Sequence, residues 1–208
     1  MINITDPKIN DYLMRLSEEN DSYLLEMEHI AEKKKFPIVG RLVGRLLYIL
    51  TRLKAPKLVV ELGSGFGYSA YWFAKALNKG KVVLIDYRAE NMDYARDLFR
   101  KAGFIRKALF RTGNALEIAQ EYKNIDMLFI DIDKHQYCDA IDKLIPNLDR
   151  NALIIADNSL WYGKVAEKVR DKKTLEIRRF NRYLFGHPDF VTTILPLRDG
   201  VLVSYKIR

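Results

Sequence analysis

The feature that most constrains the fold is an alternation of short apolar runs with longer segments of helical length. The apolar runs cover residues 57–62, 81–86, 108–114, 125–131 and 152–157, and helical segments between them cover 68–77, 89–102 and 136–146. Strands that alternate with helices in this way form a parallel sheet through right-handed crossovers, with helices on both faces. We therefore predict an α/β fold with a doubly wound sheet.

Both ends of the chain depart from this alternation. Residues 8–34 carry apolar positions at helical spacing, which predicts two helices broken near "ENDS", and residues 40–53 predict another helix. After a charged helical region at 164–185, the runs "FVTTILPL" and "GVLVSYKI" flank "RDG", a pattern typical of a hairpin with glycine at its turn. The full prediction is a mostly parallel seven-stranded sheet that ends in an antiparallel hairpin, with extra N-terminal helices.

The length of the chain indicates a single domain. With 208 residues it is long enough for one sizeable core and too short for two comfortable ones. We predict one domain over 1–208, with N-terminal helices in 1–53 and the α/β core in 54–208. The 35 Lys and Arg residues against 27 Asp and Glu give a net charge of +8, which favours an anionic partner, although a basic surface can also serve solubility alone.

Cysteine content and the N-terminal sequence bear on the cellular compartment. The single cysteine, Cys138, cannot form an internal disulfide, which fits a reducing cytoplasm. The first 22 residues are polar and acidic, unlike the basic and then apolar pattern of a signal peptide. No run approaches the ~18 apolar residues of a membrane span. We therefore expect a cytoplasmic protein without a membrane partner.

Glycines stand between the first strand and the helix that follows it, in "VVELGSGFGYSA". Gly63, Gly65 and Gly67 would let the backbone pass close to a ligand and would leave the helix N-terminus open to a negative group. Asp86 ends the next strand, where an acid meets ribose hydroxyls in nucleotide-binding folds. The order of strand, glycines, helix, strand and acid predicts a nucleoside cofactor; the alternative is a plain glycine-rich turn with exposed acids.

The residues around these glycines distinguish between nucleoside cofactors. A dinucleotide site would require glycine at position 68, where this chain has tyrosine. Glu61 ends the first strand, where its charge would repel a pyrophosphate but suit the ammonium of a cationic cofactor. The pattern therefore favours S-adenosylmethionine.

Oxygen-bearing side chains follow two further strands. Asp131 ends the fourth apolar run, and Asp157 and Asn158 end the fifth. If those strands are neighbours, their carboxyl ends lie roughly 5 Å apart in the crevice where open α/β sheets bind ligands. Ligation by oxygen alone favours Mg²⁺ or Ca²⁺ over zinc, and three protein ligands would leave positions for water and substrate. The alternative is that these residues only cap strands or form an Asx turn.

Three pieces of the sequence resemble a known family. In their order and spacing, "ELGSGFGYSA", "LFIDIDKHQY" and "IIADNSLWYGKV" resemble the cation-dependent O-methyltransferases of the caffeoyl-CoA and catechol type, from about Glu26 to the C-terminus. The resemblance implies a Rossmann-like methyltransferase fold, S-adenosylmethionine as cofactor, a divalent cation and a homodimer. Mg²⁺ is the cation that we expect, with Ca²⁺ and Mn²⁺ as alternatives.

The resemblance also implies roles for individual residues. It implies Asp131, Asp157 and Asn158 as metal ligands, Lys134 as the base near the substrate hydroxyl and Trp161 as an aromatic contact of the acceptor. The implied cofactor contacts are Val39, Glu61, Gly63, Gly65, Gly67, Ser69, Asp86, Asn114, Ala115 and Asp131. In this set Asp86 would hold the ribose, and Asn114 and Ala115 the adenine.

The chain departs from the family pattern at two arginines. Arg198 stands in the C-terminal turn where glycine is common, and Arg88 follows the ribose acid where a small polar residue is more usual. Neither change touches the implied metal ligands, but both affect the charge around the acceptor site or the surface. We expect His135 to face solvent and Asp133 to have no direct part in the chemistry.

Together these patterns predict a metal-dependent O-methyltransferase that acts on a hydroxyl of a small, catechol-like aromatic molecule. Two alternatives stay open. The segment "EMEHIAEKKKFPIVG" also resembles bacterial enzymes that methylate a hydroxylated uridine in tRNA, and both the net charge and the basic region 168–182 suit RNA. The other alternative is a non-catalytic nucleotide-binding protein that keeps the fold without the chemistry.

Overall fold

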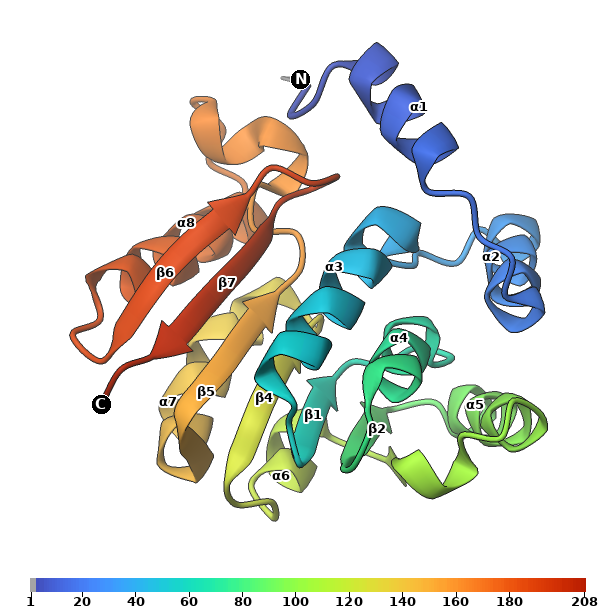
Figure 1. Cartoon of the computed structure of the whole chain (residues 1–208). Coiled ribbons are helices and arrows are strands. Elements are labelled where there is room, and N and C mark those ends of the chain that lie inside the picture. Colours follow the sequence, from blue (N-terminus) through green and yellow to red (C-terminus); the bar gives the residue numbers. More distant parts are fainter. Residues whose placement is uncertain (1–2) are drawn as a thin grey trace.

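The computed structural model describes residues 3–208 and shows a seven-stranded sheet with helices on both faces (Figure 1). The strands are β1 (Leu58–Leu62), β2 (Lys81–Asp86), β3 (Ala108–Thr112), β4 (Ile125–Ile130), β5 (Leu148–Ala156), β6 (Phe190–Leu195) and β7 (Val201–Lys206). Their order is β3-β2-β1-β4-β5-β7-β6, and β7 runs antiparallel to both of its neighbours, β5 and β6, whereas the other pairs are parallel. The predicted fold class is confirmed.

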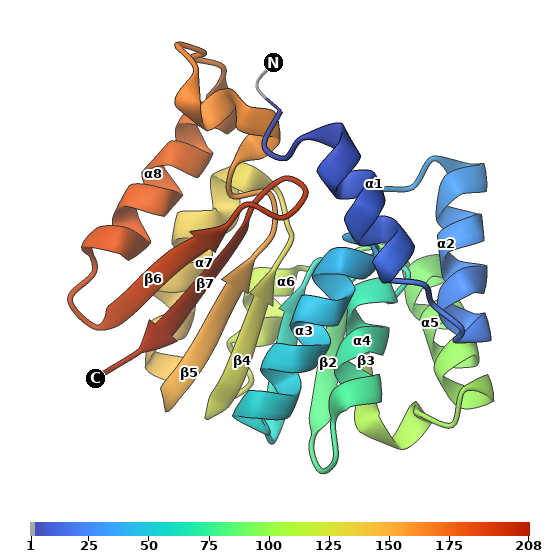
Figure 2. The same cartoon turned by 45° about the horizontal axis from the view of Figure 1, so that its top comes forward.

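The helices divide between the two faces of the sheet. They are α1 (Pro7–Leu16), α2 (Ser22–Lys34), α3 (Gly40–Lys54), α4 (Tyr68–Ala76), α5 (Ala89–Lys101), α6 (Ala115–Ala119), α7 (Tyr137–Leu144) and α8 (Lys172–Gly186). One apolar core joins the sheet to α3, α4 and α5, and a second joins it to α6, α7 and α8 (Figure 2). Because β1, β2 and β4 are covered on both sides, their sequences are nearly continuous apolar runs.

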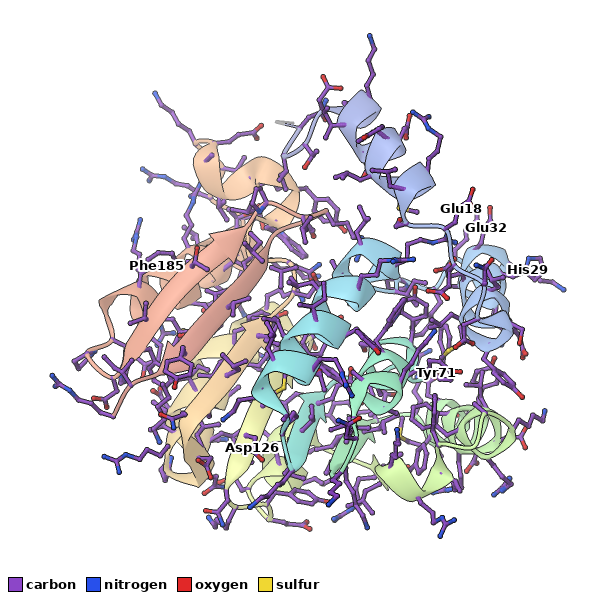
Figure 3. The ribbon with its side chains drawn as sticks, viewed as in Figure 1. Glu18, His29, Glu32, Tyr71, Asp126 and Phe185 are labelled. Carbon is purple, nitrogen blue, oxygen red and sulfur yellow. The ribbon has the colours of Figure 1, made fainter. Side chains whose placement is uncertain are left out.

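The N-terminal helices attach to the first of these cores to different extents. Helix α1 buries no side chain, whereas α2 buries Leu24, Met27 and Ala31. The hydroxyl of Tyr71 on α4 donates a hydrogen bond of 3.1 Å to Asp21, which caps α2. In Figure 3, Tyr71 lies between α4 and α2, while Glu18, His29 and Glu32 lie at the outer side of α2. Within residues 3–208, no helix is long and apolar enough to cross a membrane.

Two boundaries and one helix differ from the prediction. Strand β5 begins at Leu148 rather than 152, because its first half carries polar residues that hide it from a search for apolar runs. Helix α8 begins at Lys172 rather than near 164, since the Asp171 side chain caps it by accepting a hydrogen bond from the backbone of Thr174. Helix α6 was not predicted, because five residues are too few to show helical periodicity.

The sheet brings three carboxyl ends together. Leu62 of β1 pairs with Ile130 of β4, which pairs in turn with Ala156 of β5. The next residues along the chain are Gly63, Asp131 and Asp157. The glycine loop and both predicted acidic ends therefore meet at one edge, as expected for neighbouring parallel strands.

Candidate functional site

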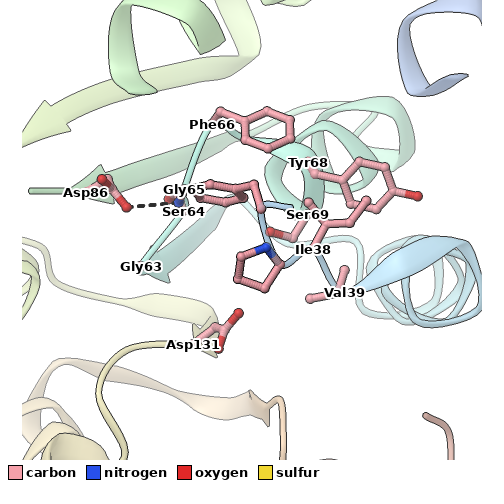
Figure 4. Close-up of a pocket in the computed structure, with 12 residues that line it drawn as sticks. Ile38, Val39, Gly63, Ser64, Gly65, Phe66, Tyr68, Ser69, Asp86 and Asp131 are labelled. Carbon is pink, nitrogen blue, oxygen red and sulfur yellow. Dashed lines mark hydrogen bonds between the residues drawn. The ribbon is translucent and has the colours of Figure 1, made fainter. Parts of the chain in front are cut away.

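A cavity of about 200 Å³ lies beside the loop that follows β1. The segment 36–39, between α2 and α3, forms its opposite wall (Figure 4). Of the residues predicted to contact the cofactor, those that line this cavity are Val39, Gly63, Gly65, Ser69, Asp86 and Asp131. The cavity therefore gathers most of the predicted cofactor site.

Two glycines allow the close approaches that form this cavity. Gly63 has φ +83°, and a Cβ atom there would lie 2.2 Å from the carbonyl oxygen of Asp131, so a larger residue would push β1 and β4 apart at their ends. The backbone N–H of Gly65 donates a hydrogen bond of 3.0 Å to Asp86 (Figure 4). Gly67 caps α4 without lining the cavity. Asp86 therefore orients the glycine loop, and its other oxygen accepts from the backbone N–H of Arg88.

Glu61 is a fully buried carboxylate without a complete set of partners. The hydroxyl of Ser69 donates to Oε1, but Oε2 has no hydrogen-bond partner within the described chain. Burial raises the pKa of Glu61 to about 7, against the hydrogen bonds from Ser69 and Ser64. Glu61 itself lines neither cavity. An ammonium that reached its Oε2 from the first cavity would supply the missing partner and would stabilise the charged form of Glu61.

A second cavity of about 400 Å³ adjoins the first. Both are lined by Pro37, Ile38, Gly63, Asp86 and Asp131, so they form one continuous site. The second cavity adds Lys134, Asp157, Asn158, Trp161 and Arg198. The structure thus places the predicted metal ligands, the predicted base and the predicted acceptor contact next to the predicted cofactor cavity.

Lys134 lies at the centre of this second group. Its Nζ is 3.1 Å from Asp131 Oδ1 and 2.5 Å from Asn158 Oδ1, and it donates a hydrogen bond of 2.6 Å to the hydroxyl of Tyr137. The same nitrogen lies 5.8 Å from the centre of the Trp161 ring. Oxygens from the ends of β4 and β5 therefore converge closely enough to share one cationic group.

Asp157 gives a test of whether a divalent cation fits here. Its side chain is 2% exposed, and Oδ1 has no hydrogen-bond partner among residues 3–208. Burial, and then the negative charge of Asp131, raise the pKa of Asp157 to about 7, while Arg198 at 3.7 Å and Lys134 act against them. A buried carboxylate oxygen left without a partner costs free energy that a bound cation would recover.

The chemistry of the donors agrees with that test. Asp131, Asp157 and Asn158 offer two carboxylates and an amide, which are ligands suited to a hard cation such as Mg²⁺. In the described part of the chain, no group of three or more His, Cys, Asp or Glu residues could hold a metal ion. A cation at this edge would therefore depend on the amide oxygen of Asn158 as well as on the acids.

Asp199 and Tyr137 support the site, and the sequence did not reveal their roles. Asp199 is buried, and it accepts hydrogen bonds from Asn158 Nδ2 at 2.9 Å and from the backbone N–H of Tyr162 at 2.7 Å. Asn158 and Tyr162 both have positive φ, a backbone conformation that needs such anchoring. Asp199 stands in "RDG" and Tyr137 in "DKHQY", so position in a motif was the only available indication.

Some predicted residues lie outside the two cavities. Asn114 caps α6 by accepting a hydrogen bond of 3.0 Å from the backbone of Leu116, and neither it nor Ala115 lines either cavity. Gly113 donates to the backbone oxygen of Asp86 at 3.0 Å, so this turn still starts beside the predicted ribose acid. His135 is exposed, as expected.

Comparisons with known proteins agree on one family. A sequence model described as O-methyltransferase matches residues 14–207. A catechol O-methyltransferase from Niastella koreensis is 30% identical over 190 residues, which cover 88% of this chain and 86% of that protein. A caffeoyl-CoA O-methyltransferase from Petroselinum crispum is 30% identical over 179 residues, which cover 79% of this chain and 74% of that protein.

Solved structures give the same result. A methyltransferase from Geobacter sulfurreducens superimposes with a TM-score of 0.88 and 38% identity, and the match covers 100% of both chains. The O-methyltransferase from Bacillus cereus in complex with SAH has a TM-score of 0.85 and 25% identity, and the match covers 96% of this chain and 97% of that one.

Proposed function

Because the chain belongs to the O-methyltransferase family, we propose that this S-adenosylmethionine-dependent O-methyltransferase uses a divalent cation to methylate one of two vicinal hydroxyls on a small, catechol-like aromatic acceptor. The observation that carries the proposal is the convergence of Lys134, Asp131, Asp157 and Asn158 beside the glycine-loop cavity. This edge brings together the cavity proposed for the cofactor, the oxygens proposed to bind a cation and a basic side chain.

The first cavity suits the cofactor. S-adenosylmethionine supplies an electrophilic methyl group on a sulfonium, and its ammonium is complementary to the partnerless oxygen of buried Glu61. Val39, Ser69 and Asp86 line the same cavity. We propose that Asp86 accepts hydrogen bonds from the ribose hydroxyls. Asn114 and Ala115, on the turn that starts beside Asp86, are proposed to hold the adenine.

The second cavity suits the cation and the acceptor. A divalent cation there would hold two adjacent acceptor oxygens and lower the pKa of the hydroxyl. We propose Asp131, Asp157 and Asn158 as its protein ligands and Mg²⁺ as the preferred ion, with Ca²⁺ and Mn²⁺ as alternatives. The support is the partnerless Oδ1 of Asp157. Trp161 lines the cavity and offers an aromatic face to the acceptor ring.

Lys134 is proposed to act as the base. The hydroxyl of Tyr137 positions its Nζ at the wall of the second cavity. In the reaction, the acceptor oxygen gains the methyl group, the neutral amine form of Lys134 takes the hydroxyl proton at Nζ, and S-adenosylhomocysteine leaves. General base catalysis of this kind contributes about 10²-fold to 10⁴-fold in rate.

The proposal is tested by calorimetric titration of S-adenosylmethionine into the protein, followed by mass-spectrometric detection of methylated catechol with Mg²⁺ or with a chelator. We expect cofactor binding in all samples and a methylated product only with the metal. Turnover that persists after removal of divalent cations would contradict the metal requirement. Cofactor binding without any methylation of catechols would contradict the acceptor class.

The tRNA alternative has less support from the structure. The net charge of +8 suits RNA, but the guanidinium of Arg178, in the basic region, donates to the backbone oxygens of Val165 and Val169 and so serves the fold. Methylation of a hydroxylated uridine in tRNA, with binding that weakens steeply with salt, would favour this alternative. Membership in the O-methyltransferase family favours an enzyme over the non-catalytic alternative.

A homodimer also belongs to the proposal. Figure 1 shows no helix from residues 3–208 over the α3 side of β7 and β6. Val191 and Tyr205 pair across these strands and are 62% and 41% exposed. A second copy of the chain would bury this apolar strip. Light scattering after gel filtration should give twice the chain mass, and Tyr205→Lys should shift it toward the monomer.

A further inference from the structure

Arg198 occupies an unusual backbone position at the edge of the site. It lies in the turn between β6 and β7 and has φ +54°, in the left-handed region. That conformation is unfavourable for a residue with a side chain, whereas glycine adopts it freely. Strain of this kind at a ligand site is a reason to look for a function of the side chain.

Arg198 lies between two cavities and lines both of them. It lines the second cavity together with Trp161, and it also lines an outer groove of about 340 Å³. The other wall of that groove includes Asn3, Ile4 and Thr5, and the Thr5 hydroxyl donates a hydrogen bond of 3.0 Å to Pro196 of the β6–β7 turn. An acceptor with its ring beside Trp161 and a substituent pointing outward would pass Arg198.

The N–H groups of the Arg198 guanidinium are available to bind a ligand. Its side chain is 41% exposed, and its one ion pair is a loose contact of 3.7 Å with Asp157 Oδ2. Within residues 3–208 it donates no hydrogen bond of its own. Lys134, the other cation that lines this cavity, already contacts Asp131, Tyr137 and Asn158. A guanidinium offers five N–H groups in a fork that matches a carboxylate or a phosphate.

We propose that Arg198 determines specificity by binding an anionic group, a carboxylate or a phosphate, that the acceptor carries outside the methylated ring. This inference rests on the proposed function, since it assumes that the acceptor ring lies in the second cavity. It narrows the substrate class from catechols in general to catechol-like acceptors with a negatively charged substituent.

The test compares acceptors in matched neutral and anionic pairs. The first pair is catechol and 3,4-dihydroxybenzoate; the second is 5-hydroxyuridine and its 5′-monophosphate, which separates a carboxylate source from a phosphate source. The ratio of kcat/KM for the anionic over the neutral member is measured for the wild type and for Arg198→Gly, Arg198→Lys and Arg182→Gln. Arg182 is exposed on α8 and lines neither the second cavity nor the outer groove, so its variant removes the same charge outside the turn.

We expect the wild type to favour the anionic member of at least one pair. Arg198→Gly should lower that ratio about tenfold, mostly through KM, because it removes charge-assisted hydrogen bonds to the anionic group from a side chain that is partly exposed. Glycine keeps the backbone conformation, so folding is preserved. Arg198→Lys should retain part of the preference, and Arg182→Gln should leave the ratio unchanged.

An unchanged ratio in Arg198→Gly, or an equal fall in Arg182→Gln, would overturn the proposal. Equal losses on neutral and anionic acceptors would also overturn it, since they would mean that Arg198 serves only Asp157. Calorimetry of 3,4-dihydroxybenzoate with S-adenosylhomocysteine and Mg²⁺ gives a readout without turnover. If the wild type methylates none of the acceptors, the proposed function fails, but carboxylate binding lost only in Arg198→Gly would still support the role of Arg198.

Discussion

Acidic side chains at the two ends of the parallel strands differ in how completely they are hydrogen-bonded. At the amino ends, Asp126 accepts hydrogen bonds of 2.8 and 2.9 Å from the backbone N–H groups of Lys57 and Leu58, and it lies near the bottom of the sheet in Figure 3. At the carboxyl ends, Glu61 Oε2 and Asp157 Oδ1 are buried without a hydrogen-bond partner in the part of the chain described.

This difference separates acids that stabilise the fold from acids that keep an oxygen available for a ligand. A carboxylate bonded to two N–H groups stabilises the native state. A buried carboxylate with a partnerless oxygen destabilises it, and burial raises the pKa of both Glu61 and Asp157 to about 7. Substitution should therefore cost stability at one end of the sheet, and cost function but not stability at the other.

Lys134→Met gives the largest expected effect. Loss of the proposed base should lower kcat by about a hundredfold, which is about 2.7 kcal/mol. Binding of S-adenosylhomocysteine, measured by calorimetry, should stay within about twofold, since Lys134 does not line the first cavity. Lys143→Met, exposed on α7, is the matched control. A kcat within a few fold of the wild type would rule out the base assignment.

Glu61→Gln should raise the free energy of unfolding by about 2 kcal/mol at about pH 8. The sign follows from the raised pKa: the folded state binds the proton of Glu61 more tightly than the unfolded state, so the stability that this carboxyl provides is present below pH 4.5 and is lost as the pH rises to about 7. Glutamine does not titrate, so the variant keeps its stability as the pH rises. Urea unfolding at about pH 8 and near pH 4.5 measures the difference in free energy between the variant and the wild type.

The pH dependence provides the internal control for Glu61→Gln. Near pH 4.5 the variant and the wild type should differ little, and Glu32→Gln, exposed on α2, should show no gain at either pH. S-adenosylmethionine should bind more weakly to Glu61→Gln, because the ammonium loses its charged partner. If Glu61→Gln and the wild type were equally stable at both pH values, the buried charge of Glu61 would not destabilise the fold, and the distinction would fail.

Asp126→Asn should give the smallest effect, and its effect on the free energy of unfolding should be opposite in sign to that of Glu61→Gln. An amide oxygen accepts the two backbone N–H groups less strongly than a carboxylate, so the free energy of unfolding should fall by about 1 kcal/mol. The kcat for catechol should not change, because Asp126 lies at the far end of the sheet. A loss of activity with normal stability would break the distinction between the two ends.

The sequence predicts the elements of this fold well because their patterns are local. The apolar runs at 57–62, 81–86 and 125–131 agree with β1, β2 and β4 to within a residue. Helix α6 and the polar half of β5 could not be found, since tertiary contacts rather than periodicity stabilise them.

The sequence predicts which residues form the site, but it does not predict the contacts between them. Strand order alone brings Asp131 and Asp157 to one edge, as the sequence indicates. The contact of Lys134 with Asn158 and the anchoring of Asn158 by Asp199 depend on loop conformations with positive φ. Such conformations are set by the assembled structure, so no pattern in "DNSLWYG" or "RDG" reveals them.

The most direct test of the central claim is urea unfolding of the wild type and Asp157→Asn at about pH 8, with and without Mg²⁺ and S-adenosylhomocysteine. Without ligands, the variant should be more stable by about 2 kcal/mol, because it removes a buried charge with a partnerless oxygen. Mg²⁺ should stabilise only the wild type. A less stable variant that gains as much from Mg²⁺ as the wild type would contradict the account.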